Sequence, residues 1–239
     1  MIMSTENLLY KKCYPINQFI NVMIPTVGEV VDKEDLYFNL VSIITAMPID
    51  MMIALDEAGI DFTTIDEYQL FLLMFDNIRN SDTSLIFGDF DLSNFKLMEN
   101  MENKTIMLFD ASTGVVIDRN IYEQIAEALR KIHHLKKNNK RPANKEAREF
   151  LIERAKKKMR RRKKTEDSSL ERLIVAMVNT EQYKYDFERT RELSIYQFNE
   201  CVRQIITKID YDNIMIGIYT GNVNPKDINQ DDLNWLNHK

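Results

Sequence analysis

The spacing of apolar residues changes along the chain and predicts a mostly helical protein. Residues 35–46 and 48–59 carry apolar side chains at helical spacing, and Pro48 and Gly59 suit the start and the end of the second helix. Thr64 begins a capping-box pattern, in which the N-cap side chain and the residue three positions later each accept from the other's backbone amide. We expect this cap to start a helix that runs to Ile78 and lies in the core.

The apolar spacing is different between residues 85 and 117, where a small β-sheet is expected. Three short apolar runs, at 95–98, 106–109 and 115–117, are separated by segments rich in turn-forming residues. This pattern predicts an antiparallel meander. Residues 19–24 also predict an extended segment, which stops at Pro25 because proline lacks the backbone donor that a central strand needs.

Helical spacing returns in the second half of the chain. Residues 121–132 are apolar at intervals of three and four, and residues 138–142 then supply a short linker with turn-forming asparagines and a proline. Ser168 and Ser194 each begin a capping box. The helix after Ser194 has the clearest apolar face, from Ile195 through Ile209.

These elements predict an α+β fold that is predominantly α-helical: N-terminal helices with a small antiparallel meander, a basic helical arm, and a C-terminal helical domain. The expected boundaries are 1–135, 136–165 and 166–239. Trp235 is expected to anchor the C-terminal tail against the domain. The chain has only 6 glycines and 5 prolines, which favours long helices over a loop-rich fold.

The charge is strongly segregated. Residues 131–164 contain 16 Lys and Arg against three acids, whereas the whole chain has a formal net charge of −5. The other 205 residues therefore sum to −18. The sequence predicts an acidic body that carries a basic arm.

The sequence leaves three interpretations of the basic arm open. Its cations contact the phosphates of a nucleic acid, or they contact an acidic protein partner, or they form a solvated helix that offsets the acidic body. Because the cation-rich end lacks aromatic residues, stacking on single-stranded bases is not supported. The candidate partner-binding residues are Arg154, Lys156, Lys157, Lys158, Arg160, Arg161, Arg162, Lys163 and Lys164.

Methionine is the other compositional bias, with 13 residues. Met47, Met51 and Met52 lie where two apolar helices meet. Flexible thioether side chains suit a surface that binds varied apolar partners, but they also fill ordinary cores. We include these three among the candidate partner-binding residues, while core packing is the favoured interpretation.

The sequence offers little that predicts catalysis. No glycine-rich phosphate loop of the Walker or dinucleotide type occurs, so nucleotide hydrolysis is not expected. His133 and His134 are adjacent and would point in different directions on a helix, which disfavours a shared metal. Asp89 and Asp91 form the best acidic cluster, but capping of local amides is favoured over acid/base chemistry. We therefore expect no enzyme activity, no catalytic residues, no metal and no cofactor.

Three features predict a protein of a reducing compartment that does not enter a membrane. Cys13 and Cys201 are far apart and form neither a disulfide framework nor a redox motif. Residues 1–10 lack the basic and apolar regions of a signal peptide. Residues 36–55 are the most membrane-like window, but polar residues and Pro48 interrupt it, which indicates two core helices.

Five apolar and turn motifs, spread over most of the chain, form a set: Pro25-Thr-Val-Gly-Glu29, Leu40-Val-Ser-Ile-Ile-Thr45 leading to Pro48-Ile-Asp50, Leu193-Ser-Ile-Tyr-Gln-Phe198, Gly217-Ile-Tyr-Thr-Gly221 and Leu233-Asn-Trp235. This set resembles tail-module proteins of tailed bacteriophages that infect Gram-positive bacteria. The motifs are architectural, so no functional residue carries over.

The resemblance implies a non-enzymatic, protein-binding role in phage tail morphogenesis. The protein would be an assembly chaperone for tape-measure or baseplate components, or a structural subunit of the tail. Its expected partners are other tail proteins (tape measure, baseplate or hub), with self-association and nucleic acid as further possibilities and no membrane. Its expected location is the host-cell cytoplasm or the virion tail.

Overall fold

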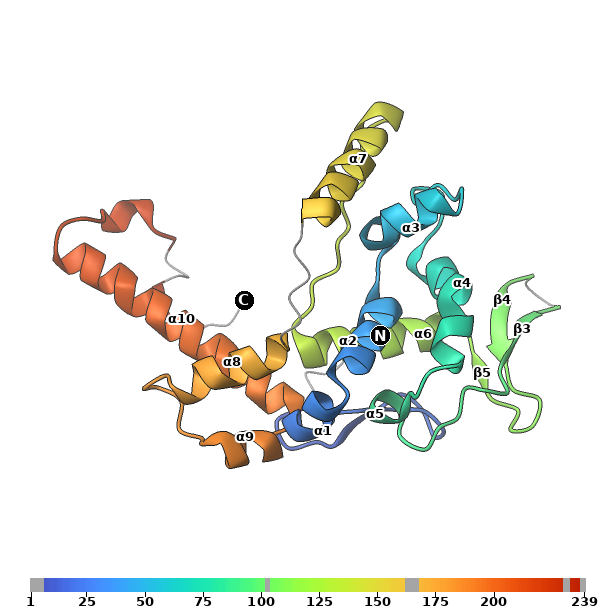
Figure 1. The fold of residues 1–239 in the computed structure, drawn as a ribbon, viewed down its shortest axis with the longest axis horizontal. Helices are drawn as coiled ribbons and strands as arrows, with labels where there is room; N and C mark the ends of the chain where they lie inside the picture. Colours follow the sequence, from blue (N-terminus) through green and yellow to red (C-terminus); the bar gives the residue numbers. More distant parts are fainter. Residues whose placement is uncertain (1–6, 102–103, 162–167, 230–232, 237–239) are drawn as a thin grey trace.

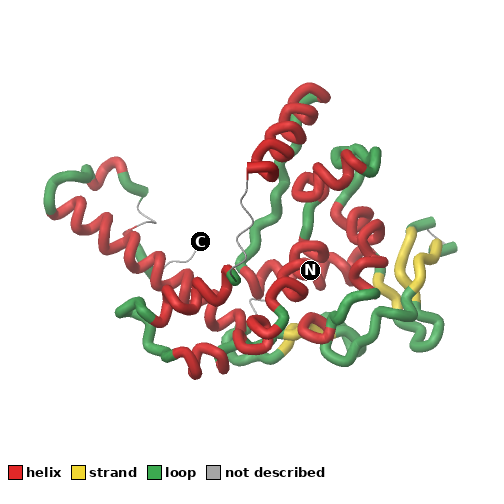
Figure 2. Tube along the Cα trace, in the orientation of Figure 1, coloured by secondary structure: helices red, strands yellow, loops and turns green. Residues whose placement is uncertain are grey.

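The computed structural model describes residues 7–101, 104–161, 168–229 and 233–236. It shows an α+β, mostly helical fold with two small antiparallel sheets, which confirms the predicted fold class (Figures 1 and 2). The elements in chain order are β1 (Cys13–Pro15), β2 (Asn21–Met23), α1 (Val27–Asp32), α2 (Glu34–Thr45), η1 (Pro48–Met51), α3 (Met52–Glu57), α4 (Glu67–Arg79), α5 (Ser84–Phe87), β3 (Lys96–Glu99), β4 (Ile106–Phe109), β5 (Val116–Ile117), α6 (Arg119–His133), α7 (Lys145–Arg161), α8 (Ser169–Val178), α9 (Phe187–Glu192), α10 (Ile195–Tyr219) and η2 (Pro225–Asp227).

Helix α6 is at the centre of the main hydrophobic core. Its apolar face, which includes the buried side chains of Ile125 and Leu129, packs against α2, α4 and α10. The Tyr122 hydroxyl, also on α6, donates to the carbonyl oxygen of Ile44 at 3.1 Å, so the buried phenol keeps a hydrogen-bond partner. The helix predicted from apolar spacing over 121–132 is therefore confirmed as a core element.

The predicted meander is also confirmed. Strands β3, β4 and β5 pair in order, and Leu108 of β4 lies opposite Ile117 of β5. Both of these side chains are buried, whereas β3 is exposed along its whole length. Tyr68 of α4 donates a hydrogen bond from its hydroxyl to the carbonyl of Ile106 (3.1 Å), which ties the sheet to the helices.

Two predicted helix boundaries in the N-terminal half are wrong. Asp66, not Thr64, is the N-cap of α4, and it forms a capping box with Gln69. The Thr64 hydroxyl instead donates to the carbonyl of Asp61 at 2.8 Å, which closes the preceding turn. The predicted helix over 48–59 is divided into the 3₁₀ turn η1 and the short helix α3.

The start of α8 depends on a residue far away in the sequence. The Ser168 side chain accepts from the amide of Glu171 at 2.8 Å, which is the N-cap half of the predicted capping box. The carboxylate of Glu34, at the start of α2, accepts from the hydroxyl of Ser168, from that of Ser169 at 3.1 Å and from the amide of Leu170 at 3.0 Å. This contact joins the first and last thirds of the chain.

The C-terminal helices share the main core with the N-terminal elements. Backbone hydrogen bonds of 2.8 Å connect the amide of Val27 with the carbonyl of Leu193, and the amide of Ile195 with the carbonyl of Pro25. The same apolar cluster contains side chains from α2, α6, α8 and α10. The predicted boundaries at residues 135 and 165 remain a prediction about sequence organisation.

Helix α10 extends beyond the body (Figure 1). Ile195 and Phe198 in its first turn are buried, but Ile209 is 38% exposed, so the predicted apolar face is only partly covered. Trp235 contacts this helix as predicted: its carbonyl accepts from Gln204 at 3.1 Å, and its ring lies under the Lys208 ammonium at 5.6 Å.

Candidate protein-binding surface

Helix α7, which contains most of the predicted basic arm, contacts α3. In Figure 1 it projects from the top of the body. Asn144 caps its start by accepting from the amide of Ala147 at 2.8 Å. Ile152 is the only described residue of α7 that is fully buried. It belongs to a second apolar cluster, which contains Ala46, Ile49, Leu55, Phe62, Leu70 and Ile152.

Two ion pairs hold α7 beside this second cluster. Arg148 pairs with Asp61, and Lys156 pairs with Asp56 of α3 at 2.6 Å. Lys156 is therefore committed to a contact within the protein. These contacts fix which face of α7 points toward α3 and which face points toward solvent.

The solvent face of α7 is strongly basic. Arg154, Lys157, Lys158, Arg160 and Arg161 are all exposed. Only Lys157 has an ion pair among the contacts of the described residues, a long one of 3.4 Å to Glu153 on the same helix. The predicted residues Arg162, Lys163 and Lys164 lie outside the described residues.

An aromatic residue that the sequence analysis did not select lies on the same face. Phe150 is 63% exposed, and it precedes Arg154, Lys157 and Arg161 at intervals of four, three and four residues. These intervals place the four side chains on one side of a helix. The repeating interval was visible in the sequence, but the exposed side could be identified only once Ile152 was known to face the protein.

The three candidate methionines pack against the second apolar cluster, to which α7 contributes Ile152. Met47, Met51 and Met52 are partly buried and pack against the second cluster, and Met51 also contacts the main core. Met51 is therefore the methionine of these three that contacts both apolar clusters. The interpretation that favours core packing agrees with this placement.

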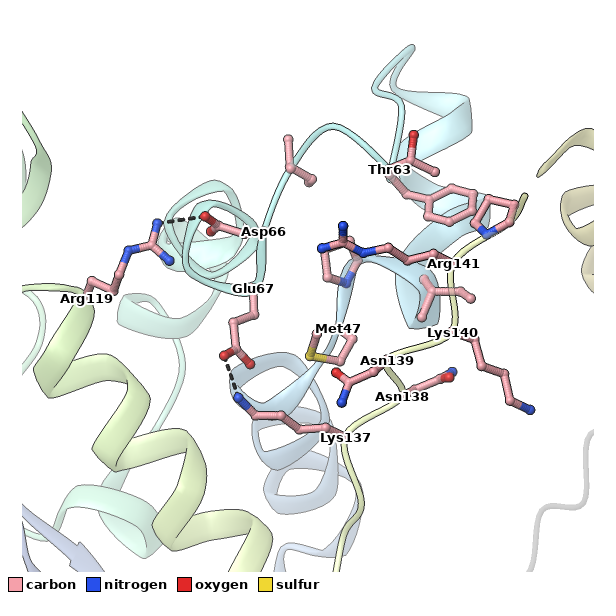
Figure 3. A pocket seen from close by; sticks show the side chains of 15 residues that line it. Met47, Thr63, Asp66, Glu67, Arg119, Lys137, Asn138, Asn139, Lys140 and Arg141 are labelled. Atoms are coloured by element: carbon pink, nitrogen blue, oxygen red, sulfur yellow. Dashed lines mark hydrogen bonds and ion pairs between the residues drawn. The ribbon is translucent and has the colours of Figure 1, made fainter. Parts of the chain in front are cut away.

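A shallow pocket of about 330 Å³ lies between η1, the start of α4 and the linker before α7. Its floor is apolar and includes Met47, Ile49 and Phe62. Figure 3 shows the Arg141 side chain directed into this pocket, while that of Lys140 points away from it. The pocket thus combines an apolar floor with a cation at its mouth, on the side of the molecule that carries α7.

A buried ionic network closes one side of the pocket. Glu67 accepts from Arg130 at 2.9 Å and from Lys137 at 2.6 Å, and the second of these contacts is drawn in Figure 3. Arg130 is only 4% exposed and also donates to the carbonyl of Thr45 at 2.8 Å. The network ties the linker to the core, and sequence spacing gave no sign of it because Glu67 and Arg130 are 63 positions apart.

Asp91, His133 and His134, which were considered for chemistry, form contacts within the protein. Asp91 accepts from the amide of Ser93 at 2.8 Å and from its hydroxyl, which agrees with the local capping role favoured from the sequence. His133 faces Tyr37, while His134 ends α6 and pairs with Glu200. Within the described ranges, no group of three or more potential ligands is arranged to hold a metal ion.

None of the helices in the part of the chain that the structure describes combines the length and apolar character needed to span a bilayer. This agrees with reading residues 36–55 as separate elements, which are α2, η1 and α3.

Residues 161–239 match a family model described as the YomV second domain. YomV proteins are a phage-encoded family of Bacillus, so the match supports a phage origin for the chain. The matched segment includes α8, α9 and α10, whereas α7 lies almost entirely before it. No curated protein and no solved structure matches the chain.

Proposed function

We propose that this chain is a non-enzymatic, protein-binding factor of phage tail morphogenesis. It acts as an assembly chaperone for tape-measure or baseplate components, or as a subunit of the tail, and meets its partners in the host-cell cytoplasm. The family match supports the phage setting. The tail role rests on the resemblance of the apolar and turn motifs to tail-module proteins.

The observation that carries the protein-binding role is the solvent face of α7. This face presents Arg154, Lys157 and Arg161 in line with the exposed ring of Phe150. An apolar anchor beside several cations fits an acidic segment that brings at least one apolar side chain, such as an amphipathic acidic helix. Because Ile152 and two ion pairs hold α7 in place, the surface is ordered before a partner arrives.

The proposal is tested by capturing partners from phage-infected cells with the full chain. Reversal of Arg154, Lys157 and Arg161 to glutamate should abolish co-purification of tape-measure, baseplate or hub proteins. A matched control reverses three exposed cations elsewhere, Lys96, Arg172 and Lys226, and so changes the net charge equally. Retention of the tail proteins by the α7 variant, or their equal loss from the control, would contradict the proposal.

A second candidate function is binding of nucleic acid, which the cluster of exposed cations on α7 favours. Binding to phosphates weakens steeply with salt. A plot of the logarithm of the binding constant against the logarithm of the salt concentration becomes steeper by roughly one unit for each phosphate contact. Removal of three cations should then lower that slope by about 2–3. Salt-dependent retention on duplex DNA that the α7 variant loses, without capture of any tail protein, would favour this alternative.

A further inference from the structure

The apolar face of α10 begins inside the protein and continues beyond it. Ile195 and Phe198 are buried in the main core, and Val202 packs against that core while partly exposed. The same stripe continues through Ile206 and Ile209, which are 53% and 38% exposed. Figure 1 shows this outer part of the helix projecting from the body.

The exposed residues of the outer part follow a coiled-coil spacing. Ile206, Ile209, Asn213 and Ile216 are all exposed and are separated by three, four and three residues. Continuing the series by four residues reaches the exposed Thr220, just after the helix. This alternation assigns positions 206, 213 and 220 to the a positions of a heptad and positions 209 and 216 to the d positions.

The opposite side of the same helix is already occupied. The C-terminal tail contacts it through Trp235, which lies at Gln204 and Lys208. By helical geometry, Gln204 and Lys208 point roughly 140–180° away from Asn213. The tail therefore lies on the side of α10 that faces away from the heptad positions.

The side chain of Asn213 indicates which kind of partner helix can pack against the heptad face. No hydrogen bond from its side chain occurs among the contacts of the described residues, although it lies in the middle of an isoleucine stripe. An asparagine at a single a position favours a partner with an amide at the same level, because each amide can donate to and accept from the other. A second copy of the chain, parallel and in register, supplies that amide by symmetry.

The charges beside the stripe are compatible with this arrangement. Lys208 pairs with Asp212 on the same helix, which leaves Asp210 as the exposed acid next to Ile209. In a parallel pair, position 210 (an e position) faces position 205 of the other helix (a g position), which is isoleucine. Asp210 therefore does not meet its own copy.

We propose that the outer part of α10 is a self-association surface through which two copies of the chain form a parallel, in-register helical pair. The seam covers about two heptads, which is short for a coiled coil, so we expect a reversible dimer whose population rises with protein concentration. Dimerisation places two basic α7 faces in one particle, but it does not depend on which partner α7 binds.

Sedimentation velocity at protein concentrations from about 1 to 200 µM tests the proposal, because it detects dimers whose Kd lies within that range. The wild-type chain should pass from monomer to dimer, and Ile206→Asp should raise the dimer Kd by at least about tenfold, because it buries a charge in the seam. Leu73→Asp is the matched control, since Leu73 of α4 is also 53% exposed, and it should leave the Kd unchanged. A wild-type monomer at every concentration, or an Ile206→Asp chain that dimerises normally, would overturn the proposal.

The role of Asn213 is tested by Asn213→Ile. This substitution removes the residue that specifies two strands and leaves isoleucine at both a and d positions, which favours three. The mass should therefore shift from dimer toward trimer.

Register is tested by Asn213→Cys in a chain with Cys13→Ser and Cys201→Ala. Mild oxidation should produce a covalent dimer, whereas Val175→Cys, at a position of α8 that is 46% exposed, should not. Equal cross-linking of both variants, or none of the Asn213→Cys chain, would overturn the parallel arrangement.

Discussion

The hydroxyl of Tyr37 lies 2.8 Å from Nε2 of His133, across the junction between α2 and α6. Burial lowers the pKa of His133 to about 4, and the nearby His134 acts in the same direction. Burial also raises the pKa of the Tyr37 hydroxyl. The cavity beside His133 is lined by two cations, Arg130 and Lys136, and by one acid, Asp50. The folded protein therefore keeps this imidazole neutral.

The depressed pKa of His133 predicts loss of stability in mild acid. Well above pH 6.5 the side chain is neutral in both states, but as the pH falls through 6.5 toward 4 the unfolded chain takes up a proton that the folded chain excludes. The free energy of unfolding should fall by up to about 3 kcal/mol over this range. His133→Gln should flatten urea-unfolding free energies between pH 6.5 and 4.5, and an unchanged slope would contradict the assignment.

The contact between Glu34 and the start of α8 predicts a second stability effect. Burial alone would raise the pKa of the Glu34 carboxyl, but hydrogen bonds from Ser168, Leu170 and Ser169 outweigh it and lower the pKa. Glu34→Gln should therefore cost about 1–2 kcal/mol of unfolding free energy at pH 7, as loss of a helix cap does. The cost should shrink as the pH falls through the lowered pKa, because the stabilising form is the carboxylate.

Glu57→Gln is the matched control for Glu34→Gln, because Glu57 lies exposed at the end of α3. It should change the unfolding free energy by less than about 0.5 kcal/mol. Equal effects of the two substitutions at pH 7 would show that charge alone, and not the cap on α8, accounts for the loss.

Local patterns in the sequence predicted the elements whose causes are local. The capping box at Ser194 and Gln197 is formed, and the apolar spacing over 121–132 gives α6. Thr64 failed as a cap because Asp66, two residues later, competes for the same helix start and forms its own capping box. Two candidate caps that lie two residues apart cannot be ranked without knowing the turn that precedes them.

Only part of the candidate surface could be predicted from the sequence. Charge counting identified the basic arm, but its inward face depends on Asp56 and Asp61, which lie about 90–100 positions earlier. The pairing of Glu67 with Arg130 is equally distant in sequence. Such contacts follow from the tertiary packing of α3, α4, α6 and α7, and no local periodicity encodes them.

The buried network around Glu67 predicts an order of mutational effects. Arg130→Ala should cost about 3–5 kcal/mol, because it leaves the carboxylate of Glu67 in a poorly solvated site with one partner fewer. Lys137→Ala should cost no more than about 1 kcal/mol, since the Lys137 side chain is 35% exposed. Thermal and urea unfolding of both variants would check this order, and a larger loss for Lys137→Ala would show that the linker contact dominates.

Because α7 is docked through Ile152, we predict that one substitution can detach α7 from the second apolar cluster without unfolding the rest of the protein. Ile152 is 7% exposed, and it is the residue that α7 contributes to the second apolar cluster. Truncating a buried isoleucine to alanine costs about 2–5 kcal/mol, which is enough to undock a helix held otherwise by surface ion pairs. Amide hydrogen exchange in α7 and α3 should accelerate in Ile152→Ala, while exchange in α6 should remain as in the wild type.

Phe150→Ala is the matched control for this prediction, because Phe150 lies on the same helix but is 63% exposed. It should leave hydrogen exchange in α3 unchanged, since it removes no contact with the second cluster. Phe150→Ala should still lose partner capture, because it removes the apolar anchor of the binding surface, whereas Ile152→Ala should lose capture together with accelerated exchange. Accelerated exchange throughout α6 in Ile152→Ala would contradict local undocking and would mean that the two apolar clusters unfold together.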